Sequence, residues 1–160
     1  MRKLALPAVL VGLSLVFAPA AQASACYSAA SLPAAKLRHL DVMLMVSALR
    51  CRTGADDFQV DYERFLDHNR GTLSAANHAM LDDLAGHMGA ARASAEMDKL
   101  SVMMANHYGN GSGVGCHELR MVAQDLGTTV EPDALVDAAE ALVGEAALQQ
   151  ACSADFASRR

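Results

Sequence analysis

The sequence predicts an all-α domain, a single compact bundle of five or six helices stapled by two disulfides. Three observations lead to this fold class. Apolar residues recur every three or four positions along the chain, which is the spacing of one helix face. Only four prolines interrupt it, and no stretch shows the alternation of a half-buried strand. Four cysteines in a chain that opens with an export signal favour two disulfides.

The first 25 residues predict a signal peptide that is cleaved. Arg2 and Lys3 precede an apolar run from Leu4 to Phe17, and small residues with Ala-x-Ala spacing follow up to Ala25. The run is shorter than the roughly 20 residues that a membrane span needs, and no later stretch is long and apolar enough. We therefore expect a periplasmic or secreted helical domain, residues 26–160, with no transmembrane segment in the mature chain.

Lipidation at Cys26 is the alternative to a soluble mature chain. The sequence "ASAC" at residues 23–26 is a poor lipobox because it lacks the usual leucine. A lipid on Cys26 would also leave an odd number of thiols in an oxidising compartment, so cysteine parity favours the soluble form.

The mature chain is acidic. Without Arg2 and Lys3 it keeps 11 of the 13 basic residues against 18 acidic ones, a formal net charge of −7. The basic residues are scattered, whereas binding to nucleic acid or to anionic lipid needs them clustered. We expect no nucleic-acid partner; the partner is an envelope protein or a small ligand that the sequence does not identify.

Two helices are expected in the first half of the mature chain. Residues 37–51 are apolar on nearly every side, as in a helix at the centre of a bundle. Residues 55–71 place Phe58, Tyr62 and Phe65 on one stripe, and Gly71 is a helix stop signal.

Four more helices are expected after Gly71. The third lies within residues 72–89 and the fourth within residues 91–108. The fifth follows a glycine-rich stretch and ends at Gly127, and the sixth begins around Pro132, since proline suits a first helical turn.

Reach limits how the cysteines pair. A helix from about Pro33 to Cys51 is roughly 27 Å long, and the six residues back to Cys26 extend only about 20 to 25 Å. Pairing of Cys26 with Cys51 is therefore disfavoured. Cys51 should pair with Cys116 or Cys152; we prefer Cys51 with Cys116 and Cys26 with Cys152.

The glycine-rich stretch "YGNGSGVG" separates the fourth and fifth helices. Its glycines follow one another at every second position, which differs from the G-x-G-x-x-G of a dinucleotide site, and a helix rather than a strand precedes it. We predict a helix connection with a turn at Asn110-Gly111, and no cofactor. An anion site formed by free N–H groups before a helix is the alternative.

Metal binding is a second possibility. Met103 and His107 share a helix face, and His117 follows the loop; these ligand types suit copper in an exported protein. Methionines at helical spacing are more often core residues. A catalytic thiol at Cys116 is disfavoured because the exported cysteines should be oxidised. No glutamate is marked out as the buried acid of a peptidoglycan hydrolase.

Two long segments, "LRHLDVMLMVSALRCRTGADDFQVDYERFLDHNRGTL" and "ANHYGNGSGVGCHELRMVAQDL", resemble a group of small exported bacterial helical proteins of unknown function. Some of these carry the transferred name S-adenosyl-L-homocysteine hydrolase. The sequence does not support that activity, because the chain lacks the strands, the dinucleotide fingerprint and the length. The resemblance implies no catalytic residue.

The sequence thus predicts an exported, non-catalytic helical protein with a binding or structural role. Three alternatives stay open: an acid-stress or envelope chaperone, since six histidines and many carboxylates titrate between neutral and acid pH; a copper-binding protein; and, least favoured, a peptidoglycan-active hydrolase.

Overall fold

The computed structural model describes residues 27–128, 131–144 and 146–148, and all regular structure within them is helical. This confirms the all-α prediction. Five helices are α1 (Leu32–Cys51), α2 (Gln59–Met88), α3 (Ala90–Gly109), α4 (Cys116–Leu126) and α5 (Pro132–Leu142), and residues 146–148 add a short helical turn. In the described residues no helix is long and apolar enough to cross a membrane.

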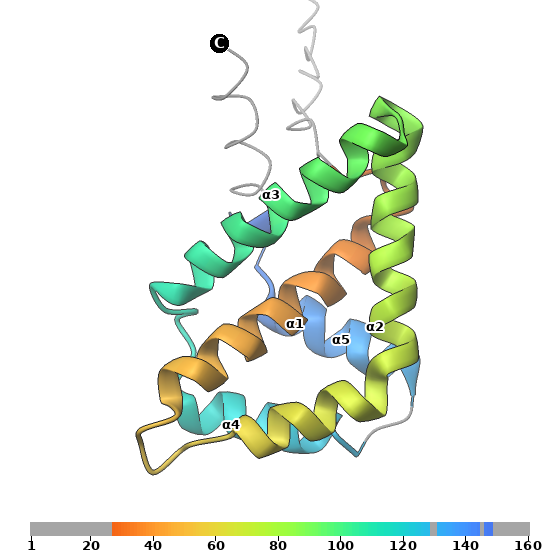
Figure 1. The fold of residues 1–160 in the computed structure, drawn as a ribbon. Helices are drawn as coiled ribbons and strands as arrows, with labels where there is room; N and C mark the ends of the chain where they lie inside the picture. Colours follow the sequence, from red (N-terminus) through yellow and green to blue (C-terminus); the bar gives the residue numbers. More distant parts are fainter. Residues whose placement is uncertain (1–26, 129–130, 145, 149–160) are drawn as a thin grey trace, which may run out of the picture.

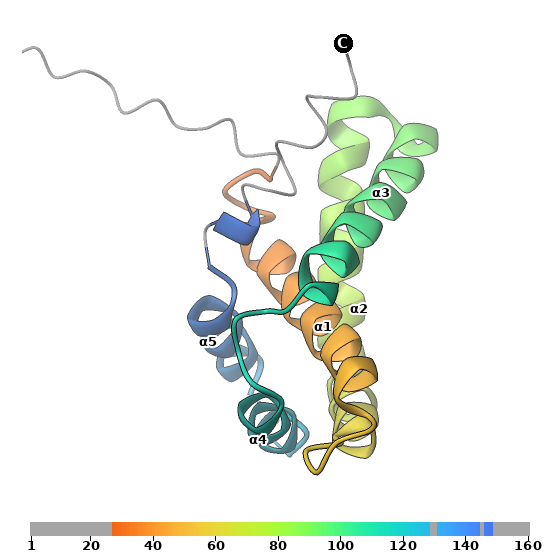
Figure 2. The same cartoon turned by 90° about the vertical axis from the view of Figure 1, so that its left-hand side faces the viewer.

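Helix α1 is the centre of the bundle. It packs against each of the other four helices, and Figures 1 and 2 show it between α3 on one side and α5 on the other. Pro33 fits its first turn, where the missing N–H has no helical partner. The expectation of a helix buried on nearly every side is correct except near its C-terminal end, where Met45 is 37% exposed, Leu49 is 52% exposed and Arg50 is also exposed.

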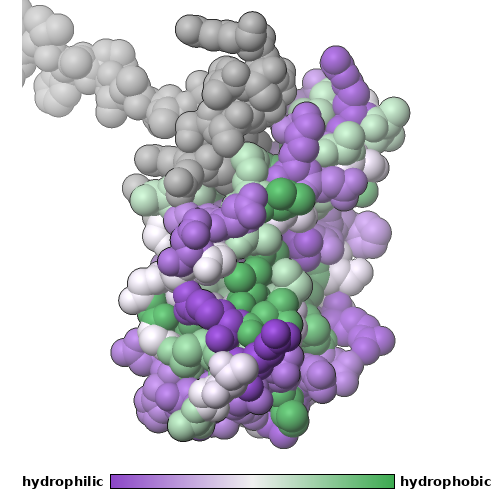
Figure 3. Space-filling view, turned by 60° about the vertical axis from the view of Figure 1, so that its left-hand side comes forward, coloured by the Kyte–Doolittle hydropathy of each residue, from purple (hydrophilic) through white to green (hydrophobic). Residues whose placement is uncertain are grey.

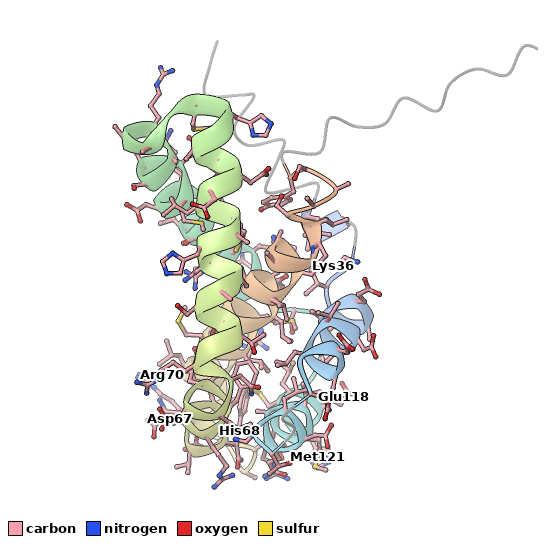
Figure 4. All side chains as sticks on the ribbon, turned by 90° about the vertical axis from the view of Figure 1, so that its right-hand side faces the viewer. Lys36, Asp67, His68, Arg70, Glu118 and Met121 are labelled. Carbon is pink, nitrogen blue, oxygen red and sulfur yellow. A yellow bond between two sulfur atoms is a disulfide. The ribbon has the colours of Figure 1, made fainter. Side chains whose placement is uncertain are left out.

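Helix α2 corrects the prediction of two separate helices that meet at Gly71. It runs unbroken from Gln59 to Met88, and Figure 1 shows it bending midway. The bend lies beside Arg70, which Figure 4 labels, and the helix continues through Gly71. A glycine inside a helix costs only about 1 kcal/mol, less than the burial of Phe65 before it and Met80 after it contributes. The helix ends at Gly89, whose φ is 83°.

The disulfide joins Cys51 to Cys116, the favoured pairing, with Cα atoms 5.9 Å apart. It ties the last residue of α1 to the first residue of α4. The expected pair Cys26–Cys152 and the signal peptide, residues 1–25, lie outside the described residues. Gly127 follows α4 and Pro132 begins α5, as the sequence predicted.

Candidate functional site

The glycine-rich segment is the helix connection that the sequence predicted. Residues 110–115 link α3 to α4, and Gly111 and Gly113 adopt φ values of 111° and 78°. The N–H of Gly115 donates to Glu118 Oε2 at 3.1 Å, so a carboxylate already caps the N-terminus of α4. This arrangement does not favour an anion in the same place.

Position 111 disfavours any residue other than glycine for two reasons. Its φ is in the region that favours glycine, and a Cβ there would lie 3.2 Å from Arg50 Nη1. We expect Gly111→Ala to lower the unfolding free energy by about 1 to 2 kcal/mol, measured by urea denaturation. Gly109→Ala is the matched control, because its added Cβ would make an ordinary 3.9 Å contact with Val46. Equal stabilities of the two variants would contradict the expected strain.

The three predicted metal ligands lie on two helices. Met103 and His107 are half-buried on α3, and the His107 ring lies edge-on to Tyr108. His117, on α4, has its Nδ1 3.1 Å from Asp56 Oδ1 and 3.3 Å from Arg120 Nη2. The two histidines therefore contact different groups, and the guanidinium beside His117 repels a cation.

No other metal site stands out in the part of the chain that the structure describes. Within it, no three or more His, Cys, Asp or Glu side chains are grouped to hold a metal ion. Copper binding stays a prediction. Cys116 is oxidised in its disulfide, as expected, so it offers no free thiol.

A cleft of about 430 Å³ opens between α1 and the bend of α2. Its polar lining includes Asp41 from α1 and Glu63, Asp67 and Arg70 from α2. Figure 4 shows Asp67 and Arg70 together on the side of α2 that faces away from α5, and their side chains form an ion pair. Two exposed carboxylates line the cleft, Asp67 and Glu63. Asp67 is paired with Arg70, whereas Glu63 has no partner among the described residues.

Asp41 and Arg38 together link three helices at the edge of this cleft. Its Oδ1 accepts from the Tyr62 hydroxyl at 3.0 Å and its Oδ2 from Arg38 Nη1 at 3.1 Å. Arg38 also donates to Ser101 Oγ on α3 at 3.2 Å. Burial raises the pKa of Asp41, while the Tyr62 hydrogen bond and the Arg38 charge oppose that rise. Asp41 was not predicted as a site residue; its only signal in the sequence is that it is an acidic residue within an apolar run.

A second buried polar contact joins α1 to α3. His39 is 1% exposed, and its Nδ1 lies 3.0 Å from the Tyr108 hydroxyl. Its Nε2 and the Tyr27 hydroxyl are buried without a hydrogen-bond partner among the described residues. Burial, and secondly the charge of His107, lower the pKa of His39 to about 4. His39 is therefore neutral at pH 7, and protonating it would place a charge in the core.

One side of α1 stays open to solvent. Met45 and Leu49 are exposed on this side. The half-buried Asp41, one turn before Met45, and the exposed Arg52, which caps the helix after Cys51, continue the same spacing of three or four residues. We call these four residues the α1 face. Figure 3 shows that hydrophobic residues also reach the surface of the molecule as a group, bordered by hydrophilic ones. The sequence does not indicate this face, because residues 37–51 are apolar on nearly every side.

Two described glutamates stand out, one by its burial and one by its place in the cleft. Glu96 is buried on α3 and pairs with Lys99 at 3.2 Å, but it does not line the cleft. Glu63 lines the cleft but is exposed. Asp41, the half-buried carboxyl in the cleft, already accepts hydrogen bonds from Arg38 and Tyr62.

Comparison of the chain with protein-family models, curated proteins and solved structures gives no match. The resemblance to small exported bacterial helical proteins therefore stays a prediction.

Proposed function

We propose that this chain is an exported, periplasmic or secreted, non-catalytic protein that acts by binding, and that the α1 face is its binding surface. The observation that carries the proposal is the exposure of two large apolar side chains, Met45 and Leu49, one turn apart on the central helix. Apolar side chains left exposed together on a rigid element are a usual feature of protein-binding surfaces.

The fold supports this use of α1. The helix is packed on the other four helices, and the Cys51–Cys116 disulfide fixes its C-terminal end. A surface held in this way loses little conformational entropy when it binds. Each exposed apolar side chain that becomes buried then contributes about 1 kcal/mol or more to association.

Site-specific photo-cross-linking in the exporting cell tests the proposal. A photoreactive residue at Leu49 should give a discrete adduct, and the Met45→Glu substitution should abolish it. Val60, which is 67% exposed at the start of α2, provides the matched position where no such adduct is expected. Equal cross-linking from positions 49 and 60 would rule out the α1 face as the binding surface. So would an adduct from position 49 whose yield is the same with and without the Met45→Glu substitution.

An acid-stress chaperone is the second candidate, and the His39–Tyr108 contact favours it. Protonation of His39 in acid loosens the packing of α1 against α3 and exposes apolar core. The purified protein should then suppress aggregation of acid-unfolded client proteins at about pH 3 and not at neutral pH. No suppression across several clients would dismiss this candidate.

A further inference from the structure

We infer that the partner of the α1 face is the α1 face of a second copy of this chain, docked in antiparallel orientation. The inference rests on the proposed binding role of this face and names its occupant. It follows from the order of apolar, acidic and basic groups along α1 and from the unpaired charges at its two ends.

The apolar centre of the face is self-complementary. A two-fold axis passing between Met45 and Leu49 sets Met45 of each copy against Leu49 of the other. Both side chains then leave water in both copies. The flexible thioether of Met45 adapts to the branched Leu49 side chain without a preformed pocket.

The charges at the two ends select the antiparallel orientation. The N-terminal end of the face adjoins the cleft that holds Glu63, and the C-terminal end carries the exposed Arg52. In two antiparallel helices the residue numbers of facing positions have a constant sum, which is 94 when position 45 faces position 49. Arg52 of one copy therefore faces position 42 of the other copy, which is next to Asp41 and the cleft. A parallel arrangement would instead place like charges together, which is unfavourable.

Both charged groups are available for this contact. Neither Arg52 nor Glu63 makes an ion pair or side-chain hydrogen bond with any residue that the structure describes. Asp41, in contrast, is already held by Arg38 and Tyr62. The intermolecular pair we assign is therefore Arg52 with Glu63 of the second copy, one at each end of the two-fold interface.

The size of the face sets the expected strength. From Asp41 to Arg52 the helix extends about 17 Å, which is small against the roughly 800 Å² per partner of a stable interface. We therefore expect a weak dimer with a Kd of about 10 to 100 µM.

Sedimentation velocity of the purified chain over about 1 to 500 µM tests the inference. The wild type should shift from monomer to dimer mass, and Leu49→Glu should raise the Kd at least about tenfold by placing a charge in the apolar centre. Val60→Glu, an equally drastic change at an exposed valine of α2, should behave as the wild type. Far-ultraviolet circular dichroism confirms that each variant is folded.

A charge exchange tests the orientation. Arg52→Glu should weaken the dimer about tenfold. Adding Glu63→Arg should restore it, because the two charges of each intermolecular ion pair are then exchanged and still attract each other. Failure of the double variant to recover would overturn the antiparallel pairing. A single monomeric species at every concentration, or a Kd unchanged in Leu49→Glu, would overturn self-association through this face.

The two proposals fail in different ways. A monomeric chain whose cross-link at Leu49 still depends on Met45 would refute the second copy as occupant and leave the binding function standing with another partner. A chain that is monomeric and also gives no Met45-dependent cross-link at Leu49 would refute both proposals. An adduct of twice the chain mass would support both.

Discussion

The double substitution C51A/C116A is expected to lower the free energy of unfolding by about 4 kcal/mol. The disulfide closes a chain segment with a sequence separation of 65 residues, which includes all of α2 and α3. Without it the unfolded chain gains the entropy of that loop, and the N-terminus of α4 is no longer attached to α1. Urea denaturation of both proteins, with a common m-value, measures the difference.

The variant C26A/C152A provides the control for this prediction. It retains Cys51 and Cys116, so adding a thiol reductant to it should reproduce most of the loss seen in C51A/C116A. Intact masses before and after reduction count the disulfides in the wild type, and two are expected from the sequence. A loss below about 1 kcal/mol on removing Cys51 and Cys116 would mean that packing alone holds α4 in place.

The sequence predicted the helical class from the spacing of its apolar residues. Reach disfavoured only the Cys26–Cys51 pair and left Cys116 or Cys152 as the partner of Cys51, and the preferred partner, Cys116, is the one in the structure. The prediction that a helix ends at Gly71 was wrong. A glycine is a local stop signal, but here the apolar stripe of the helix continues on both sides of it. Phe65, Asn69, Ala76 and Met80 continue one buried stripe across the glycine. Burial along 30 residues outweighs one unfavourable helical position, and a single sequence does not show which effect is larger.

The candidate surfaces were harder to predict than the helices. Asp41 and His39 are single polar residues within an apolar helix, and periodicity does not distinguish a hydrogen-bonded core residue from one in a cleft. Likewise, Met45 and Leu49 look like core residues, since helix α1 is apolar all round. Their exposure follows from where α2 and α3 cross α1, and that arrangement arises only when the whole bundle is assembled.

The pH dependence of stability is the second large effect, and His39 is its source. We expect the wild type to lose about 3 kcal/mol of unfolding free energy through His39 alone between pH 7 and pH 4. The folded pKa of this buried imidazole is about 4 against an ordinary value of 6.5. Between these values the unfolded chain binds a proton that the folded chain excludes, so stability falls as the pH is lowered.

Other groups change stability in the same pH range, and the experiment must separate them from His39. Asp41 acts in the opposite direction: its raised folded pKa means that the native chain holds its proton more tightly in acid. Asp83 has a lowered pKa because Ser31 and Ser28 donate hydrogen bonds to it, so its contribution is lost only at still lower pH. Both remain in any variant of position 39.

The substitution His39→Gln isolates the effect, because glutamine can hydrogen-bond to Tyr108 and does not titrate. Its absolute stability can differ from the wild type; the informative quantity is the change in unfolding free energy from pH 7 to pH 4, which should be smaller by about 3 kcal/mol. His68, exposed on α2 in Figure 4, gives the control His68→Gln, because its imidazole is solvated in both states. Parallel pH profiles of wild type and His39→Gln would show that the buried imidazole is protonated as readily in the folded chain as in the unfolded one. The acid-stress function would then lose the observation that favours it.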